Sequence, residues 1–139
     1  MVVVREGTVL LVRQYRLLIN RLSWEIPGGR VESGETPERA AARECLEEAG
    51  VRCRSLRPLL VYHAGLDILH NPTHVFVAED WEATPEARGE PAEVQERTWV
   101  PLPRCLEMIV AGKIVDSLSI IGLLTYQAFG GALGDRGAT

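Results

Sequence analysis

The hydrophobic positions in the first third of the chain form short runs of branched and aromatic residues, separated by residues that favour turns. These runs are residues 2–4, 8–13 and 24–26, and residues 15–20 are expected to continue the second run. Glu6-Gly7 is typical of a turn, and Pro27-Gly28-Gly29 ends the last run. We therefore predict that this third of the chain is β-structure.

An Ala-rich segment between residues 36 and 50 has the start and stop signals of a helix. Thr36 is suited to the N-cap and Pro37 to the first helical position, while Gly50 is a typical C-terminal glycine. A second, largely apolar segment, residues 116–129, predicts a helix near the end of the chain, preceded by a shorter one at residues 104–111.

Three more strands are predicted at residues 56–62, 74–78 and 97–100. Residues 82–95 contain two prolines, one glycine and several glutamates, and are predicted to be a solvated loop. Strands around a helix, with another helix at the end, indicate an α/β or α+β fold. At 139 residues the chain is predicted to be one domain, 1–139, with a flexible Gly-rich tail from about residue 130.

The charge balance excludes two classes of partner. The chain has 15 Lys and Arg against 19 Asp and Glu, a net charge of −4, and its basic residues form no block. Binding to nucleic acid or to an anionic membrane surface is therefore not expected. The longest apolar tract, residues 109–129, is broken by Lys113 and Asp116, so no membrane span is expected. Three cysteines without a paired spacing indicate reduced thiols and a cytoplasmic location.

The predicted helix ends in an acidic cluster that works against helix stability. Glu44, Glu47 and Glu48 are spaced to share one face, and like charges at this spacing destabilise a helix by roughly 0.2–0.5 kcal/mol per pair. They also lie near the helix C-terminus, where the macrodipole disfavours negative charge. A solvated acidic face is the simplest interpretation of such a cluster.

Two neighbouring features favour a metal site instead. Arg43 can orient a carboxylate of the cluster, and the turn at Gly28-Gly29 lets backbone atoms approach a ligand closely. Carboxylate oxygens suit Mg²⁺ or Mn²⁺, and Mg²⁺ is commonly held by one or two carboxylates together with substrate phosphates. With Glu35 upstream, the segment is compatible with a metal–phosphate site.

The spacing of these residues resembles the Nudix box, G-x5-E-x7-R-E-U-x-E-E-x-G-U, where U is a bulky aliphatic residue. Gly29, Glu35 and the run Arg43-Glu44-Cys45-Leu46-Glu47-Glu48-Ala49-Gly50-Val51 match it, with Cys45 as the one departure. The resemblance implies the Nudix α/β/α sandwich with a mixed sheet. It also implies divalent cations, Mg²⁺ or alternatively Mn²⁺, held by Glu44, Glu47, Glu48, Glu35 and the backbone of Gly28. Arg43 would hold the glutamates in place.

The implied reaction is hydrolysis of a nucleoside diphosphate linked to another group. Gln14-Tyr15-Arg16 and the run from Trp24 to Gly29 resemble the branch of ADP-ribose and nucleotide-sugar pyrophosphatases. Arg16, Tyr15, Trp24, Glu25, Arg30 and Gly29 are therefore the candidate substrate contacts, and a homodimer is among the assemblies that this branch implies. Two alternatives are a Nudix hydrolase of nucleoside triphosphates or dinucleoside polyphosphates, and a non-catalytic Nudix regulator.

The resemblance to this branch also implies a general base, because in the branch a glutamate on a mobile loop after the fourth main strand often takes the proton of the attacking water. Glu90, Glu93 and Glu96 are the candidates, and alignment on Trp99-Val100-Pro101-Leu102 favours Glu93. Glu90 and Glu96 remain alternatives for the general base.

Overall fold

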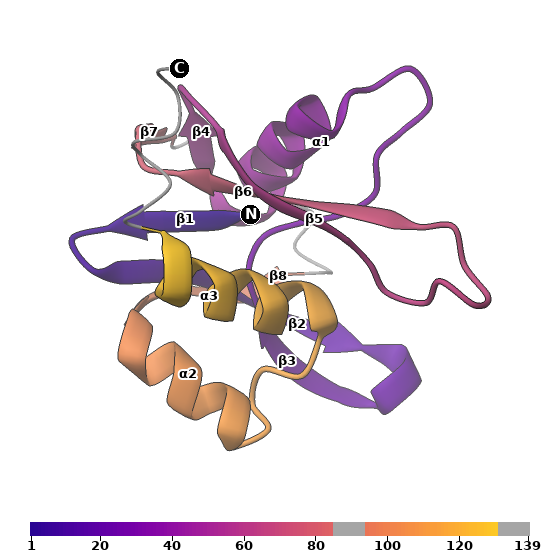
Figure 1. Ribbon diagram of the computed structural model, residues 1–139. Coiled ribbons are helices and arrows are strands. Elements are labelled where there is room, and N and C mark those ends of the chain that lie inside the picture. The colour runs from indigo at the N-terminus through magenta and orange to yellow at the C-terminus, as the bar shows by residue number, and fades with distance from the viewer. Residues whose placement is uncertain (85–93, 131–139) are drawn as a thin grey trace.

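A computed structural model describes residues 1–84 and 94–130 of the chain (Figure 1). Its centre is a mixed sheet with strand order β3-β2-β1-β6-β5, and β8 pairs with the opposite edge of β2. The strands are β1 (Val2–Arg5), β2 (Thr8–Arg16), β3 (Arg21–Glu25), β5 (Arg57–His63), β6 (Pro72–Ala78) and β8 (Val94–Pro101). β1 and β6 are parallel, whereas the other described pairs of this sheet are antiparallel.

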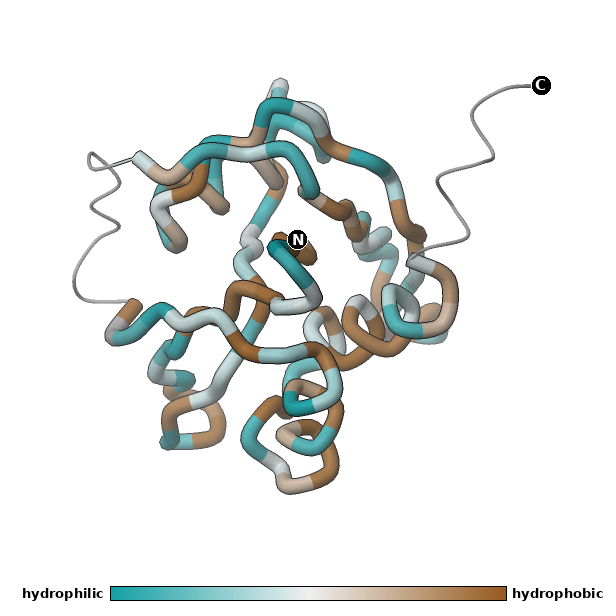
Figure 2. The backbone as a smooth tube through the Cα atoms, turned by 90° about the vertical axis from the view of Figure 1, so that its left-hand side faces the viewer, coloured by the Kyte–Doolittle hydropathy of each residue, from teal (hydrophilic) through white to brown (hydrophobic). Residues whose placement is uncertain are grey.

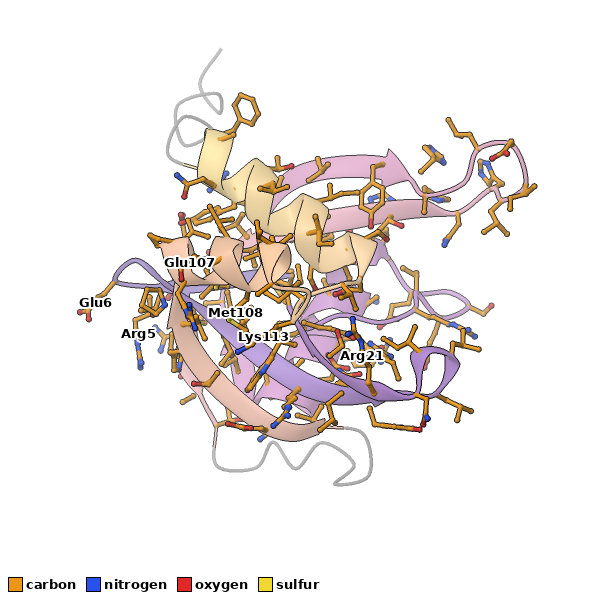
Figure 3. All side chains as sticks on the ribbon, turned by 90° about the horizontal axis from the view of Figure 1, so that it is seen from below. Arg5, Glu6, Arg21, Glu107, Met108 and Lys113 are labelled. Carbon is orange, nitrogen blue, oxygen red and sulfur yellow. The ribbon has the colours of Figure 1, made fainter. Side chains whose placement is uncertain are left out.

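Helices cover both faces of the sheet. On one face lie α1 (Pro37–Glu44) and its continuation η2 (Cys45–Ala49), and on the other lie α2 (Leu102–Val110) and α3 (Ser117–Phe129) (Figures 1 and 3). α3 is apolar over most of its length (Figure 2). This arrangement confirms the predicted sandwich with a mixed sheet.

Two buried clusters explain why the strands are continuous apolar runs rather than alternating ones. Along β1, β2 and β6, successive residues point to opposite faces, and both faces are covered. The cluster under α2 and α3 contains Val2, Val9, Leu11, Val75, Val77, Cys105, Met108 and Leu123. The cluster under α1 and η2 contains Val3, Leu10, Val12, Cys45, Ala49, Phe76 and Ala78.

The helix signals in the sequence are confirmed at both ends. The Thr36 hydroxyl accepts a hydrogen bond from the Arg39 amide at 3.3 Å, and Pro37 is the first helical residue. Gly50 has a φ of 72° and ends the helix in the left-handed conformation that glycine adopts readily. Between these ends, the last five residues of the helix, Cys45–Ala49, are π-helical rather than α-helical.

Three expectations about the strands need correction. Residues 15–20 do not continue β2 throughout, because the chain turns in the short 3₁₀ helix η1 (Leu17–Ile19) and Asn20 has a φ of 49°. A two-stranded sheet of β4 (Val51–Cys53) and β7 (Trp81–Ala83) was not predicted. Within the predicted loop at residues 82–95, Glu82 and Ala83 belong to β7 and Val94 begins β8, while residues 85–93 lie outside the described residues.

Two further observations concern the chain as a whole. Cys45, Cys53 and Cys105 are free thiols. Within the described residues, none of the helices is long and apolar enough to cross a membrane.

Candidate functional site

The turn after β3 brings the backbone against the end of the helix that carries the acidic cluster. A Cβ atom on Gly29 would lie 2.2 Å from Oε1 of Glu44, so the Glu44 carboxylate takes the space that any other side chain would need. The amide of Gly28 donates a hydrogen bond to Oε2 of Glu48 at 2.9 Å. Glu44 and Glu48 therefore meet at the same two-glycine turn.

Glu48 is a buried carboxylate, with only 8% of its surface exposed. Its Oε1 accepts a hydrogen bond from Nε2 of Gln14 on β2 at 2.6 Å, and its backbone carbonyl accepts one from Nε of Arg97 on β8. Burial raises the pKa of the Glu48 carboxyl, and the bonds from Gly28 and Gln14 oppose this shift. The side chain is thus fixed from two sides while its charge is poorly solvated.

The guanidinium of Arg43 donates hydrogen bonds to three other glutamates of the site. Its Nε and Nη2 atoms donate to the two oxygens of Glu35, each at 3.1 Å, while Nη1 reaches Glu44 at 2.9 Å and Glu47 at 3.2 Å. The Arg43 guanidinium lowers the pKa of Glu35, and the bond to Glu35 raises the pKa of Arg43. Arg43 also donates to the carbonyl of Arg30 at 3.0 Å, which ties the helix to the loop after the turn.

The π-helical turn changes how the glutamates share the helix surface. The expectation of one common face assumed α-helical spacing, but Glu44 precedes the π-helical residues and Glu47 and Glu48 lie within them. Glu47 has 55% of its side chain exposed, whereas Glu44 has 16% and Glu48 is buried. The three carboxylates therefore have different surroundings. Their spacing in the sequence, interpreted with α-helical periodicity, does not predict this difference.

The described residues fit a cation held by two carboxylates rather than by a closed cage. No group of three His, Cys, Asp or Glu side chains in residues 1–84 and 94–130 is arranged to hold a metal ion. Glu44 and Glu48 nevertheless flank a turn whose backbone approaches them closely. Mg²⁺ commonly binds one or two carboxylates and completes its shell with water and substrate phosphates, so this donor set suits it. Glu35 and Glu47 are paired with Arg43, which also contacts Glu44.

Beyond Val12, the sheet face that packs on α1 and η2 becomes polar. Gln14, Ser23 and Glu25 are buried there, and Gln14 contacts Glu48. The guanidinium of Arg16 forms a two-point ion pair with Glu25, with Nε to Oε1 at 2.8 Å and a second contact from Nη2 to Oε2. This pair raises the pKa of Arg16. Arg16 remains half-exposed at the edge of the face, so its outer side is open to a ligand.

A cavity of about 740 Å³ adjoins the two-glycine turn on this side. Four of the six predicted substrate residues line it, namely Tyr15, Arg16, Glu25 and Gly29. Its apolar wall includes the exposed residues Leu17, Leu18 and Ile19 of η1. Asp116, which caps α3 through a bond from the Ser119 amide at 2.8 Å, also lines it, and burial raises the pKa of this carboxyl.

The other two predicted substrate residues lie elsewhere. Arg30 lines a different cavity of about 550 Å³, together with both glycines of the turn, Asn71 and His74. Trp24 packs against the core under α2 and α3, with the Arg13 guanidinium 5.5 Å from its ring centre. Trp24 is therefore not among the residues that line the larger cavity, and it lies on the opposite face of β3 from Glu25, which does line it.

Of the three candidates for the general base, Glu96 alone lies within the described residues. Glu90 and Glu93 lie outside the described residues. Glu96 forms an ion pair with Arg13 at 3.3 Å, and these two residues are paired across β2 and β8. Since Arg13 and Gln14 point to opposite faces of β2, Glu96 lies on the face away from Glu48.

Gln14 and Arg97 are site residues that we did not predict. Gln14 occupies a strand position that continues the buried alternation of Leu10 and Val12, and a polar residue at such a position is a usable signal. Arg97 gives no comparable signal, because its contact with the Glu48 carbonyl depends on the register of β2 with β8.

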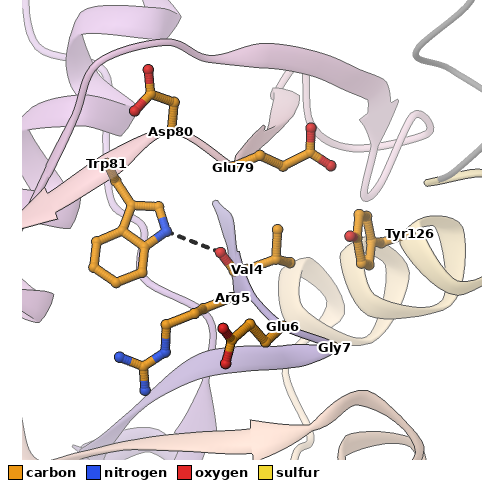
Figure 4. Close-up of a pocket in the computed structure, with 8 residues that line it drawn as sticks. All are labelled: Val4, Arg5, Glu6, Gly7, Glu79, Asp80, Trp81 and Tyr126. Atoms are coloured by element: carbon orange, nitrogen blue, oxygen red, sulfur yellow. Dashed lines mark hydrogen bonds between the residues drawn. The ribbon is translucent and has the colours of Figure 1, made fainter.

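Another hollow of about 550 Å³ lies at the turn between β1 and β2 (Figure 4). It is lined by Val4, Arg5, Glu6, Gly7, Glu79, Asp80, Trp81 and Tyr126. The indole nitrogen of Trp81 donates to the Val4 carbonyl at 2.9 Å. None of the residues of the acidic cluster lines this hollow, so it is separate from the site described above.

Comparisons with known proteins agree with this geometry. A family model described as the NUDIX domain matches residues 1–115. The chain is 36% identical over 124 residues to a CMP-5'-(N-acetyl-N-hydroxy-3-aminopropyl)phosphonate hydrolase of Streptomyces rubellomurinus, covering 89% of this chain and 60% of that protein. It is 31% identical over 126 residues to an ADP-ribose pyrophosphatase of Bacillus subtilis, covering 88% and 66%.

A solved structure titled ADP compounds hydrolase has the same fold, with a TM-score of 0.82, 19% identity, and coverage of 94% of this chain and 70% of that one. The chain spans 60% and 66% of the length of the two relatives named above. The family model covers most of the chain, and the residues of the box converge at one turn in the fold. The chain therefore belongs to the Nudix family.

Proposed function

We propose that this protein is a divalent-metal-dependent pyrophosphohydrolase that cleaves a nucleoside diphosphate derivative, namely ADP-ribose or a related nucleotide sugar. The observation that carries the proposal is the meeting of Glu44 and Glu48 at the Gly28-Gly29 turn, beside an open cavity. Nudix hydrolases generally need a divalent metal, and we propose Mg²⁺, with Mn²⁺ as a substitute.

A bound cation would neutralise the diphosphate, activate a water molecule and stabilise the leaving phosphate. The chain's own residues have distinct parts in this proposal. Glu44, Glu48 and the backbone of Gly28 supply oxygen ligands, while Arg43 holds Glu35, Glu44 and Glu47 close to the turn. Glu35 and Glu47, both bonded to Arg43, assist by binding water or a further cation.

The cavity beside the turn is proposed to hold the organic part of the substrate. Its wall at η1 is apolar and suits the flat face of a nucleobase, and Tyr15 in the same wall offers a ring for stacking. Arg16 is oriented by Glu25 and half-exposed, so it is placed to meet a phosphate or hydroxyl group. On the other side of the turn, Arg30 is proposed to contact the second half of the substrate.

The names of the relatives support this substrate class. One acts on a CMP-linked phosphonate and the other on ADP-ribose, and in both compounds a nucleoside 5'-phosphate is joined through phosphorus to a second group. The two-sided surroundings of the turn suit a substrate of this form, since cavities open on both sides of it. Triphosphates, by contrast, would place a chain of charges where the described cavities offer few cations.

We further propose Glu93 as the general base. Its chain neighbour Val94 pairs with Gln14, and Gln14 contacts Glu48, so this end of β8 lies at the site. Glu96 faces away from Glu48 and is paired with Arg13.

The first test is a hydrolysis panel with Mg²⁺. It compares ADP-ribose, other nucleotide sugars, a CMP-linked phosphonate, dinucleoside polyphosphates and nucleoside triphosphates, with products identified by chromatography. We expect AMP and ribose 5-phosphate from ADP-ribose. Turnover of triphosphates alone would contradict the substrate class.

The same assay tests the metal assignment. We expect Glu48→Gln to lower turnover by at least about 100-fold because a metal ligand is lost. A Glu48→Gln variant with normal turnover would contradict the metal assignment.

The second prediction concerns the base. Glu93→Gln should reduce kcat by about 100-fold, within the range of general-base catalysis, and leave the Mg²⁺ concentration for half-maximal activity unchanged. Glu96→Gln is the comparison, and it should affect kcat far less because Glu96 lies on the opposite face. Steady-state kinetics of both variants would settle the assignment. If Glu96→Gln lowered kcat more than Glu93→Gln, the assignment would be wrong.

The third prediction concerns pH and metal. Burial raises the pKa of Glu48 above its value in the unfolded chain, so the metal-free protein loses stability as pH rises through the folded pKa. A cation at Glu48 removes that penalty by stabilising the carboxylate. Mg²⁺ should therefore raise the Tm more at about pH 8 than at about pH 5, measured by calorimetry against an EDTA control. Glu48→Gln should lose most of this dependence, and an equal Tm increase at both pH values would argue against the assignment.

A further inference from the structure

Gln14 is a buried amide whose role differs from that of its neighbours on β2. It has 4% of its surface exposed and lies on the same strand face as Leu10 and Val12, which belong to the core under α1 and η2. An apolar residue at this position would extend that core. The chain has an amide instead, and burying an amide is unfavourable unless it is hydrogen-bonded.

The bond that satisfies this amide ends on the functional carboxylate. Nε2 of Gln14 donates to Oε1 of Glu48 at 2.6 Å, while the amide of Gly28 donates to Oε2 at 2.9 Å. Each oxygen of an ionised carboxylate can accept about two hydrogen bonds or ligand contacts. With one donor on each oxygen, the carboxylate is held in a fixed orientation and both oxygens keep capacity for a cation.

We propose that Gln14 is a positioning residue of the metal site, which holds Glu48 in the orientation that binds a divalent cation. Gln14 contacts neither the cation nor the substrate and acts through Glu48. The inference rests on the proposed function, in which Glu48 is a metal ligand. Residues that orient a metal ligand through a hydrogen bond commonly contribute to metal affinity even though they do not touch the ion.

A purely structural role for Gln14 predicts a different result. If the amide only filled space and satisfied its own hydrogen bonds, its loss would lower stability without a specific effect on metal binding. Arg13 provides a matched control, because it is the adjacent residue on β2 and points to the opposite face, where it pairs with Glu96 at 3.3 Å. That ion pair is exposed and contributes little to stability.

The test uses Gln14→Met, which keeps the approximate size of the side chain and removes the donor. Gln14→Asn keeps an amide but is one methylene shorter, so it covers the case in which the methionine variant does not fold. Arg13→Gln is the control. Binding of Mn²⁺ to the substrate-free protein is measured by electron paramagnetic resonance, together with the Mg²⁺ dependence of turnover, the KM for substrate at saturating Mg²⁺, and the Tm.

We expect both Gln14 variants to bind Mn²⁺ at least about 10-fold more weakly than the wild type, and to need correspondingly more Mg²⁺ for activity. The KM for substrate at saturating Mg²⁺ should stay unchanged, and Arg13→Gln should bind Mn²⁺ like the wild type. Unchanged Mn²⁺ affinity in folded Gln14 variants, whatever their Tm, would overturn the role of Gln14 alone. A wild-type protein that neither binds Mn²⁺ nor hydrolyses any substrate of the panel would overturn the proposed function and this role with it.

Discussion

The close approach between the end of the acidic helix and the two-glycine turn is the constraint on which the site depends. Glu44 occupies the space beside Gly29 that a side chain would take, and the Glu48 carboxylate accepts a hydrogen bond from the Gly28 amide. A buried carboxylate without strong partners is costly, so the hydrogen bonds from the turn and from Gln14 offset part of that cost, as the proposed cation would. The same contact fixes the helix end relative to β3 and to the cavity.

The sheet contributes the rest of the site, because one of its faces changes from apolar to polar residues along the strands. Near α1 and η2 its residues are apolar, as Leu10 and Val12 show, and further along they become buried polar residues, beginning with Gln14. A rigid apolar region thus adjoins a polar one on the same strands. Side chains on such strands are held more tightly than side chains on loops, which suits a site whose ligands must keep a fixed geometry.

Local signals predicted the parts of the structure that local chemistry determines. The Thr36 cap, the Gly50 stop and the turn at Glu6-Gly7 depend on single residues, and the spacing of the box residues identified the family. The remaining features depend on tertiary contacts. The β4–β7 pair and the contact of Arg97 with the Glu48 carbonyl both join segments that are distant in sequence. The π-helical end of the helix was not predicted either. Trp24 shows the same limit, because the face it takes depends on strand pairing.

Binding of Mn²⁺ to Gly29→Ala, without substrate, tests the central claim most directly. The new Cβ would lie 2.2 Å from Oε1 of Glu44 and must displace this flexible side chain, whereas Gly65→Ala, whose Cβ meets nothing closer than 3.6 Å, is the control. We expect Gly29→Ala to bind Mn²⁺ at least about 10-fold more weakly than the wild type, while Gly65→Ala binds it normally. Equal Mn²⁺ affinity in both folded variants would contradict a metal site built on the meeting of Glu44 and Glu48 at this turn.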